Sequence, residues 1–196
     1  MADEIVESLC RPGASRFVDA TLGDGGHSER ILDAADPGAQ LLALDWDDTA
    51  FSVAKRRLER FGDRVKIVRS GFGELARVLE EHGWGDGVDA VIADLGVSSR
   101  HLDTAERGFS FGNDGPLDMR MDRRRPESAA DLLARVGEKE LADIIYEFGE
   151  ERASRWAKAM GRPSAKRSLD PAVFERVICQ DRETTAGAQD PPPFFQ

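Results

Sequence analysis

The sequence predicts an α/β fold built on a parallel sheet. Over residues 1–96, short apolar runs alternate with amphipathic segments, at the spacing of consecutive β-α-β units. A glycine-rich turn over residues 19–27 follows the first of these runs, where sheets of this class bind ligands. Because crossovers between parallel strands are right-handed, we expect helices on both faces of the sheet.

Four apolar runs account for the expected strands. Each is short, and the second ends in an acid, Asp45. Runs of this kind are typical of strands that are buried on both faces. The expected strands are residues 16–20, 40–45, 64–70 and 87–96.

Helical spacing of apolar residues marks the segments before and between these strands. Gly62 and Gly83 close two of them, as glycines commonly do at helix C-termini. The expected helices of this region are residues 2–9, 27–35, 48–62 and 73–83.

The pattern changes near residue 97. Residues 97–126 are rich in Gly, Asp, Ser and Arg without a clear period, and a loop of that length is usually functional. Further helices are expected at residues 127–136, 138–148, 150–160 and 171–180. We therefore predict a first domain over 1–100, a loop with a helical module over 101–182, and a Pro-rich, disordered tail over 183–196.

Composition limits the class of protein. The two cysteines, Cys10 and Cys179, lack the CxxC spacing of a zinc site, so we expect no metal and a reducing compartment, the cytoplasm. The first ten residues are acidic, unlike a secretory signal, and no apolar run approaches the roughly 20 residues that span a bilayer.

Charge gives an ambiguous signal about nucleic acid. The formal net charge of −10 argues against it, because phosphate binding needs Lys and Arg. Arginines nevertheless gather over residues 120–125, and Arg162, Lys166 and Arg167 form a second group. These groups are either a basic binding face or two solvated loops.

The glycine-rich turn indicates a ligand that is not a simple dinucleotide. It reads Asp19-Ala-Thr-Leu-Gly23-Asp-Gly25-Gly26-His27, and Ser28 stands where the dinucleotide fingerprint needs its third glycine. An acid ahead of the glycines suits a cationic amino-acid tail, such as that of S-adenosylmethionine (SAM). The alternative is a tight structural turn.

Asp45 strengthens the cofactor interpretation. It ends the second strand, 22 residues after Gly23, where a carboxylate accepts hydrogen bonds from ribose hydroxyls. Trp46 either packs on adenine or is a packing residue. These signals predict an adenosine-type cofactor without separating NAD from SAM.

Two further segments carry polar and aromatic groups. Asp94 follows the fourth strand. It either faces a ligand bound at the carboxyl ends of the strands or caps a turn. The segments 106–111 and 114–122 combine acids, arginines and aromatics, so they could stack an unpaired base and hold phosphates. Alternatively, Phe109 and Phe111 form the core of an Ω-loop.

Taken together, the segments DATLGDGGHSERIL, ALDWD, DLGVSSRHLD, ERGFSF, DGPLDMRMD and LADIIYEFGEER resemble the bacterial ribosomal RNA small subunit methyltransferase H family, RsmH or MraW, from about residue 4 to about residue 155. The resemblance implies a Rossmann-like class I SAM-dependent methyltransferase sheet with a small all-helical insert domain. It also implies SAM-dependent methylation of the exocyclic N4 of a cytidine in the decoding region of 16S ribosomal RNA.

The family's cofactor contacts, carried over position by position, fall on residues of both halves of the match. They are Gly25, Gly26, His27, Asp45, Phe72, Asp94 and His101, the last standing where many relatives have Gln. For catalysis we favour Asp94 as the acceptor of an amine proton, with Ser98 and Asp118 as rivals. As phosphate contacts we predict Arg107, Arg120, Arg123, Arg124 and Arg125.

The chain departs from the family pattern in its later part. The basic end of the insert is reduced to TTAGAQDPPPFFQ, and four predicted strands are fewer than the roughly seven of this sheet. We therefore expect an incomplete sheet whose bare edge favours a homodimer. Two alternatives to an active enzyme are a truncated module that binds SAM or ribosomes without turnover, and an NAD-dependent oxidoreductase, which Ser28 disfavours.

Overall fold

The computed structural model describes residues 2–110 and 112–148. The chain divides into two compact units: the first contains residues 1–96 and 121–123, and the second contains residues 97–120 and those from 124 on. The domain boundaries predicted from sequence stay a prediction, as does their assignment to functions.

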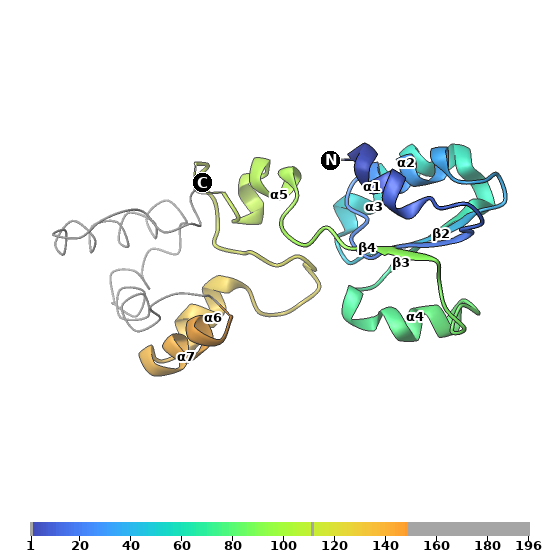
Figure 1. The fold of residues 1–196 in the computed structure, drawn as a ribbon. Helices are drawn as coiled ribbons and strands as arrows, with labels where there is room; N and C mark the ends of the chain where they lie inside the picture. Colours follow the sequence, from blue (N-terminus) through green and yellow to red (C-terminus); the bar gives the residue numbers. More distant parts are fainter. Residues whose placement is uncertain (1, 111, 149–196) are drawn as a thin grey trace, which may run out of the picture. The chain divides into compact units, whose positions relative to one another are not determined.

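A parallel sheet of four strands forms the first unit (Figure 1). In chain order the strands are β1 (Arg16–Asp19), β2 (Gln40–Asp45), β3 (Val65–Arg69) and β4 (Ala90–Ile92). Their order in the sheet is β3-β2-β1-β4, and every pairing is parallel. The predicted α/β class is therefore confirmed, although β4 is shorter than the predicted strand over 87–96.

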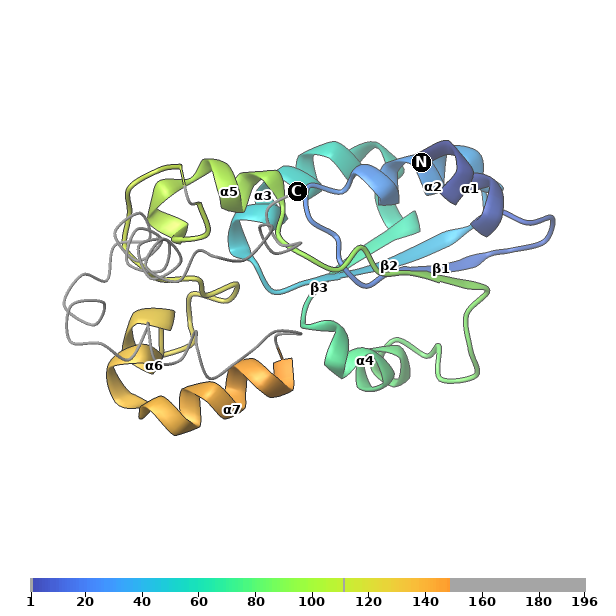
Figure 2. The same cartoon turned by 60° about the vertical axis from the view of Figure 1, so that its left-hand side comes forward.

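Helices cover both faces of this sheet, as the right-handed crossover rule predicts (Figures 1 and 2). One face carries α1 (Ala2–Leu9), α2 (Gly26–Ala34) and α3 (Asp48–Leu58), and the other carries α4 (Leu75–Glu81). Two short 3₁₀ helices, η1 (Glu59–Arg64) and η2 (Phe72–Glu74), precede β3 and α4.

The apolar faces of these helices bury two core layers. Phe17, Ile31 and Leu41 belong to the layer under α1, α2 and α3, and Leu42, Val78 and Trp84 belong to the layer over α4. Alternate residues of β2 thus enter opposite layers, because successive side chains of a strand point to opposite faces. The central strands β1 and β2 are buried on both sides, which explains their continuous apolar runs in the sequence.

The predicted helix over 48–62 ends earlier than expected. α3 stops at Leu58, and the chain continues as η1, in which Gly62 has a φ of 54°. A glycine adopts this positive φ without the steric cost that a Cβ would bring, so Gly62 redirects the chain into β3.

The described part of the second unit contains two pairs of short helices joined by one long loop. Its elements are α5 (Ser99–Asp103), η3 (Ala105–Arg107), α6 (Ala129–Arg135) and α7 (Glu138–Phe148). α5 and η3 fall within residues 97–126, where the sequence predicted only a loop. The predicted helices over 150–160 and 171–180 and the tail over 183–196 lie outside the described residues, so an all-helical insert stays a prediction.

A small core holds α6 and α7 together. Leu117, Leu133, Val136 and Leu141 are buried in it. Leu117 comes from the loop ahead of α6, and the Ala130 N–H donates a hydrogen bond of 2.9 Å to the Leu117 carbonyl oxygen. The loop and the helix pair therefore form one packed structure.

Candidate functional site

The order of the strands defines where a ligand would bind. From β1 the chain passes to β2 and then β3 on one side, and afterwards returns to β4 on the other side of β1. Ligands of such sheets bind beyond the carboxyl ends of the strands, at the point where the direction of winding reverses. That point lies between β1 and β4.

Hydrogen bonds join the loops that leave β1 and β4 at this edge. The Ala20 N–H donates to the Ile92 carbonyl oxygen at 2.8 Å, and the Asp94 N–H donates to Thr21 Oγ1 at 2.7 Å. These bonds fix the backbone of Asp94 beside the glycine-rich turn.

The carboxylate of Asp94 is exposed, and it forms no hydrogen bond or ion pair with the described residues. It therefore does not cap a turn, which was the structural alternative to a functional role. Asp94 therefore combines a fixed backbone with a carboxylate that is available at the switch point. Such a carboxylate can accept a proton or a hydrogen bond from a ligand.

Asp45 organises the glycine-rich turn and keeps acceptor capacity. Its Oδ2 accepts from the Gly23 N–H at 2.8 Å, and its Oδ1 accepts from the Asp47 N–H at 2.9 Å. An ionised carboxylate offers about four lone-pair positions, so each oxygen can accept one more bond. Asp45 can thus hold the turn and still bind ribose hydroxyls.

The first acid of the turn, Asp19, has a structural role that differs from the predicted one. Its side chain is buried, its Oδ2 accepts from Ser28 Oγ at 2.7 Å, and its Oδ1 accepts from the Thr21 N–H at 3.1 Å. Burial raises the pKa of Asp19, while the bonds from Ser28 and Thr21 oppose that rise. Ser28, which breaks the dinucleotide pattern, is the residue that anchors Asp19.

Gly25 is required by the backbone conformation ahead of α2. Its φ is 80°, which glycine adopts at no steric cost, and a Cβ at this position would meet Ala54 and Leu58 at 3.4 Å, close to an ordinary contact. Gly26 and His27 begin the helix directly afterwards. The turn therefore brings the start of α2 close to α3 and leaves the carboxyl edge of the sheet open to a ligand.

The aromatic residue exposed near this edge is Phe72, not Trp46. Phe72 begins η2 and is 51% exposed. Trp46 lies against Gly71, because a Cβ on that glycine would come within 2.9 Å of the indole ring. Of the two interpretations of Trp46, packing is the one that this contact supports.

Ser98 and His101 form one local structure at the start of α5, in the second unit. Ser98 Oγ accepts from the His101 N–H at 3.3 Å, and His101 Nδ1 accepts from the Ser98 N–H at 3.1 Å. This reciprocal pair is a capping box. His101 is buried, and its ring lies 5.1 Å from that of Phe109, centre to centre.

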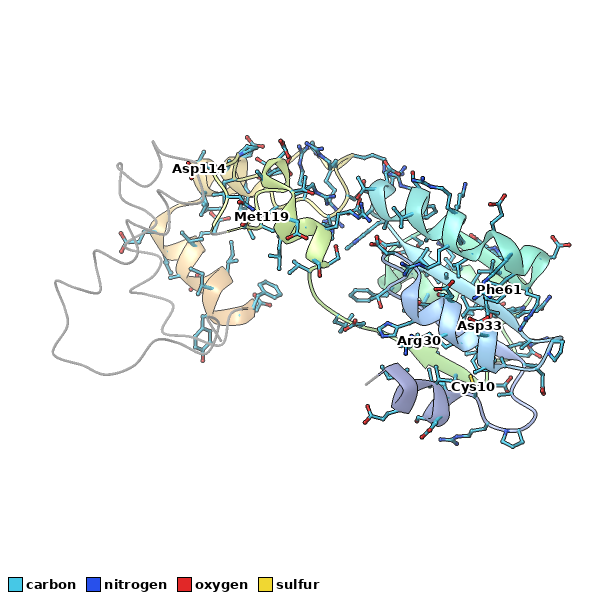
Figure 3. The ribbon with its side chains drawn as sticks, turned by 90° about the horizontal axis from the view of Figure 1, so that it is seen from above. Cys10, Arg30, Asp33, Phe61, Asp114 and Met119 are labelled. Atoms are coloured by element: carbon cyan, nitrogen blue, oxygen red, sulfur yellow. The ribbon has the colours of Figure 1, made fainter. Side chains whose placement is uncertain are left out.

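The motif over 114–122 is held by an arginine–aspartate pair (Figure 3 labels Asp114 and Met119). Asp118 is buried and accepts from Arg120 Nε at 2.8 Å and from Arg120 Nη2 at 2.7 Å. This hydrogen bonding and the negative charge of Asp118 raise the pKa of Arg120. Bidentate pairs of this kind are strong and fix orientation.

The predicted phosphate contacts fall into two groups. Arg107 is 3% exposed, and its Nη2 donates to the Arg120 carbonyl oxygen at 3.0 Å. Arg107 and Arg120 therefore serve to hold the loop. In contrast, Arg123, Arg124 and Arg125 are exposed.

Sequence reasoning missed Arg69, at the carboxyl end of β3. Its guanidinium pairs with Asp48, at the start of α3, and Arg69 Nη2 lies 3.8 Å from Asp122 Oδ1. The short segment 121–123 groups with the first unit, so this pair ties the end of the motif to β3. No local pattern in the sequence links positions 69 and 122.

The candidate residues are divided between the two units. The first contains Gly25, Gly26, His27, Asp45, Phe72, Asp94 and Arg123, and the second contains Ser98, His101, Arg107, Asp118, Arg120, Arg124 and Arg125.

Within residues 2–110 and 112–148, no three His, Cys, Asp or Glu residues gather to hold a metal ion. No helix in that part of the chain has both the length and the apolar character needed to cross a membrane.

These features define a Rossmann-like α/β protein whose polar candidate residues gather at the carboxyl edge of a parallel sheet. Comparison with known families is more specific: the model of the MraW methylase family matches residues 1–173. The chain belongs to the MraW methylase family, and the predicted family is confirmed.

Two similar curated proteins are both named ribosomal RNA small subunit methyltransferase H. That of Syntrophobacter fumaroxidans is 46% identical over 179 residues, covering 91% of this chain and 54% of the relative. That of Trichlorobacter lovleyi is 50% identical over 159 residues, covering 81% and 49%. The chain thus spans about half the length of the curated relatives it matches.

Solved structures show a weaker likeness. An rRNA methylase from Streptococcus thermophilus is 24% identical with a TM-score of 0.31, covering 39% of this chain and 44% of that chain. An O-methyltransferase family protein from Burkholderia thailandensis is 17% identical with a TM-score of 0.34, covering 64% and 40%. At these scores the likeness adds nothing to the family assignment.

Proposed function

We propose that this chain binds SAM and methylates the exocyclic N4 of a cytidine in the decoding region of 16S ribosomal RNA, in the cytoplasm and on the small ribosomal subunit. The observation that carries the proposal is the exposed, uncommitted carboxylate of Asp94, whose backbone is fixed at the switch point by Thr21. The names of the relatives supply the class of RNA.

The residues at the carboxyl edge fit the cofactor. Gly25 gives the turn its tight path, Asp45 retains acceptor capacity for two ribose hydroxyls, and Phe72 offers an exposed ring for adenine. Gly26, His27 and His101 complete the proposed set. When bound, SAM supplies a methyl group on a cationic sulfur.

Asp94 would act on the amine of the target base. The lone pair of this amine is delocalised into the ring, and a carboxylate that accepts its N–H proton localises the pair on nitrogen. Ser98 Oγ already caps α5, and Asp118 is already paired with Arg120. Because Ser98 and Asp118 already have these partners, we favour Asp94 as the acceptor of the amine proton.

Calorimetric titration with SAM tests the cofactor site. We expect saturable binding that Asp45→Ala weakens at least tenfold, because two charge-assisted hydrogen bonds are lost. Asp36→Ala is the matched control, since Asp36 is an exposed acid at the opposite, amino edge of the sheet. Equal affinities for all three chains would contradict the assignment of Asp45.

Transfer of labelled methyl from SAM to small-subunit RNA tests the reaction, with nucleoside mass spectrometry to locate the methyl group. We expect N4-methylcytidine, and a fall in kcat of roughly 100-fold or more for Asp94→Asn. Binding of SAM without transfer would instead favour the non-catalytic module that binds SAM or ribosomes.

The exposed arginines can be tested by the salt dependence of RNA binding. Two phosphate contacts to single-stranded RNA contribute about 1.4 to the slope of log K against log salt concentration. The double variant Arg123→Ala with Arg124→Ala should reduce the slope by about that amount. An unchanged slope would remove these two residues from the RNA-binding surface.

A further inference from the structure

Met119 adopts a backbone conformation that is unfavourable for a residue with a side chain. Its φ is 56°, and among the described non-glycine residues it alone has a positive φ. In this left-handed region the Cβ crowds the backbone, which is why glycine and asparagine are preferred there.

Hydrogen bonds on both sides of Met119 hold this conformation. The Met119 N–H donates to the Arg107 carbonyl oxygen at 2.9 Å, and Arg107 Nη2 donates to the Arg120 carbonyl oxygen at 3.0 Å. Before Met119, the buried carboxylate of Asp118 is fixed by the Arg120 guanidinium. The conformation is thus imposed by its surroundings.

These hydrogen bonds leave the apolar side chain of Met119 exposed to solvent. Leu117 and Asp118 are 5% and 8% exposed, whereas Met119 is 45% exposed. Glycine would fit the backbone better, yet this position carries a methionine that is among the exposed large apolar residues of the described chain. Strained residues that their surroundings hold in place cluster at ligand contacts.

We propose that Met119 is a substrate-contacting residue that packs its thioether against the face of an unstacked nucleobase. Sulfur makes favourable contacts with aromatic rings, and a flexible, polarizable side chain adapts to a flat base. The exposed arginines at 123–125 follow it closely in the chain and suit the phosphates of the same ligand. This inference rests on the proposed function and adds a contact with the base to it.

Variants that accept the backbone but lack the thioether test this role. Met119→Gly and Met119→Asn both tolerate a positive φ, and Met119→Leu keeps an apolar side chain. We expect the Gly and Asn variants to keep or raise the melting temperature and to bind SAM as the parent chain does. We expect their kcat/KM for small-subunit RNA to fall about tenfold, chiefly through KM, and that of Met119→Leu to stay within about threefold.

The outcomes separate the two levels of the proposal. Lower melting temperatures for both the Gly and Asn variants would show that the side chain stabilises the fold, and would overturn its role as a contact. Parental kcat/KM in both variants would overturn it as well. If the parent chain neither binds nor methylates RNA, the proposed function fails and the role of Met119 fails with it.

Discussion

The first unit is held together by apolar layers, whereas polar and backbone contacts contribute more to the described part of the second. Two central strands buried on both faces support most of the residues proposed to bind the cofactor. Among the described residues of the second unit, four buried apolar side chains form a small core, and the motifs over 106–110 and 114–122 are joined by backbone hydrogen bonds. The comparison shows two ways to fix a functional residue: on a rigid scaffold, or in a network of local constraints.

The close approach of these two motifs in the second unit depends on glycines. A Cβ on Gly108 would overlap the Pro116 carbonyl oxygen, and a Cβ on Gly115 would overlap the carbonyl of Ala105. The two motifs therefore approach each other as backbone against backbone, with no room for side chains between them. This explains why each contains a glycine that follows no helical or strand period.

Leu42→Ala should give the largest loss of stability, because Leu42 is fully buried in the α4-side layer of the first unit. We expect its free energy of unfolding to fall by about 2–5 kcal/mol. Chemical denaturation measures this change. Lys66→Ala is the control, since Lys66 pairs with Leu42 in the sheet but is exposed; a similar loss there would show that the layer is not responsible.

Gly108→Ala should damage the second unit without affecting the first. Overlap with Pro116 and the strain of a φ of 72° should cost about 1–3 kcal/mol. Hydrogen exchange should then accelerate in α5, η3 and α6 while the strands keep their protection. Gly112→Ala, with open space around its Cα, should leave exchange unchanged. Faster exchange in β1 and β2 would mean that the units do not respond separately.

Ser128→Ala should have a smaller, local effect. Ser128 Oγ accepts from the Asp131 N–H at 3.1 Å in a capping box at the start of α6. Loss of such a cap costs about 1 kcal/mol, which should appear as faster exchange in the first turn of α6. Ser128→Thr should keep protection, because its hydroxyl can accept from the Asp131 N–H and donate to the Asp131 carboxylate as Ser128 does; equal loss in both variants would argue against capping as the cause.

Asp19→Asn should have the smallest effect, confined to pH dependence. Burial raises the pKa of Asp19 above its usual value of 3.8, so the folded state holds the proton more tightly than the unfolded state. The protonated Asp19 side chain contributes its full stabilisation below about pH 3.8. This contribution is lost as the pH rises through the pKa of Asp19 in the folded state. The asparagine variant should therefore lose less stability than the parent as the pH rises above about 4.

Unfolding curves recorded across that range would check the prediction for Asp19, and the same curves for Asp36→Asn provide the control. Asparagine can keep contacts with Ser28 and Thr21, so a large loss of stability at every pH would contradict it. In that case the charge of Asp19, and not its hydrogen bonding, would hold the glycine-rich turn.

The sequence predicted most of the first unit because its signals are local. Apolar runs and helical spacing mark β2 and α1 to the residue, and the glycine-rich turn and Asp45 fall at the carboxyl edge of the sheet. The helices α5 and η3 were missed because five and three residues are too few to show a period.

The sequence by itself determined the α/β class and the family, because each depends on motifs or periodicity within one stretch of chain. The cofactor contacts that the family resemblance implies stay a prediction. The tertiary structure alone decided that Asp19 is buried on Ser28, that Arg107 supports a loop, that Arg69 reaches Asp122 and that Met119 is turned outward. These outcomes depend on which distant groups meet, and on whether a side chain ends in water or in the core.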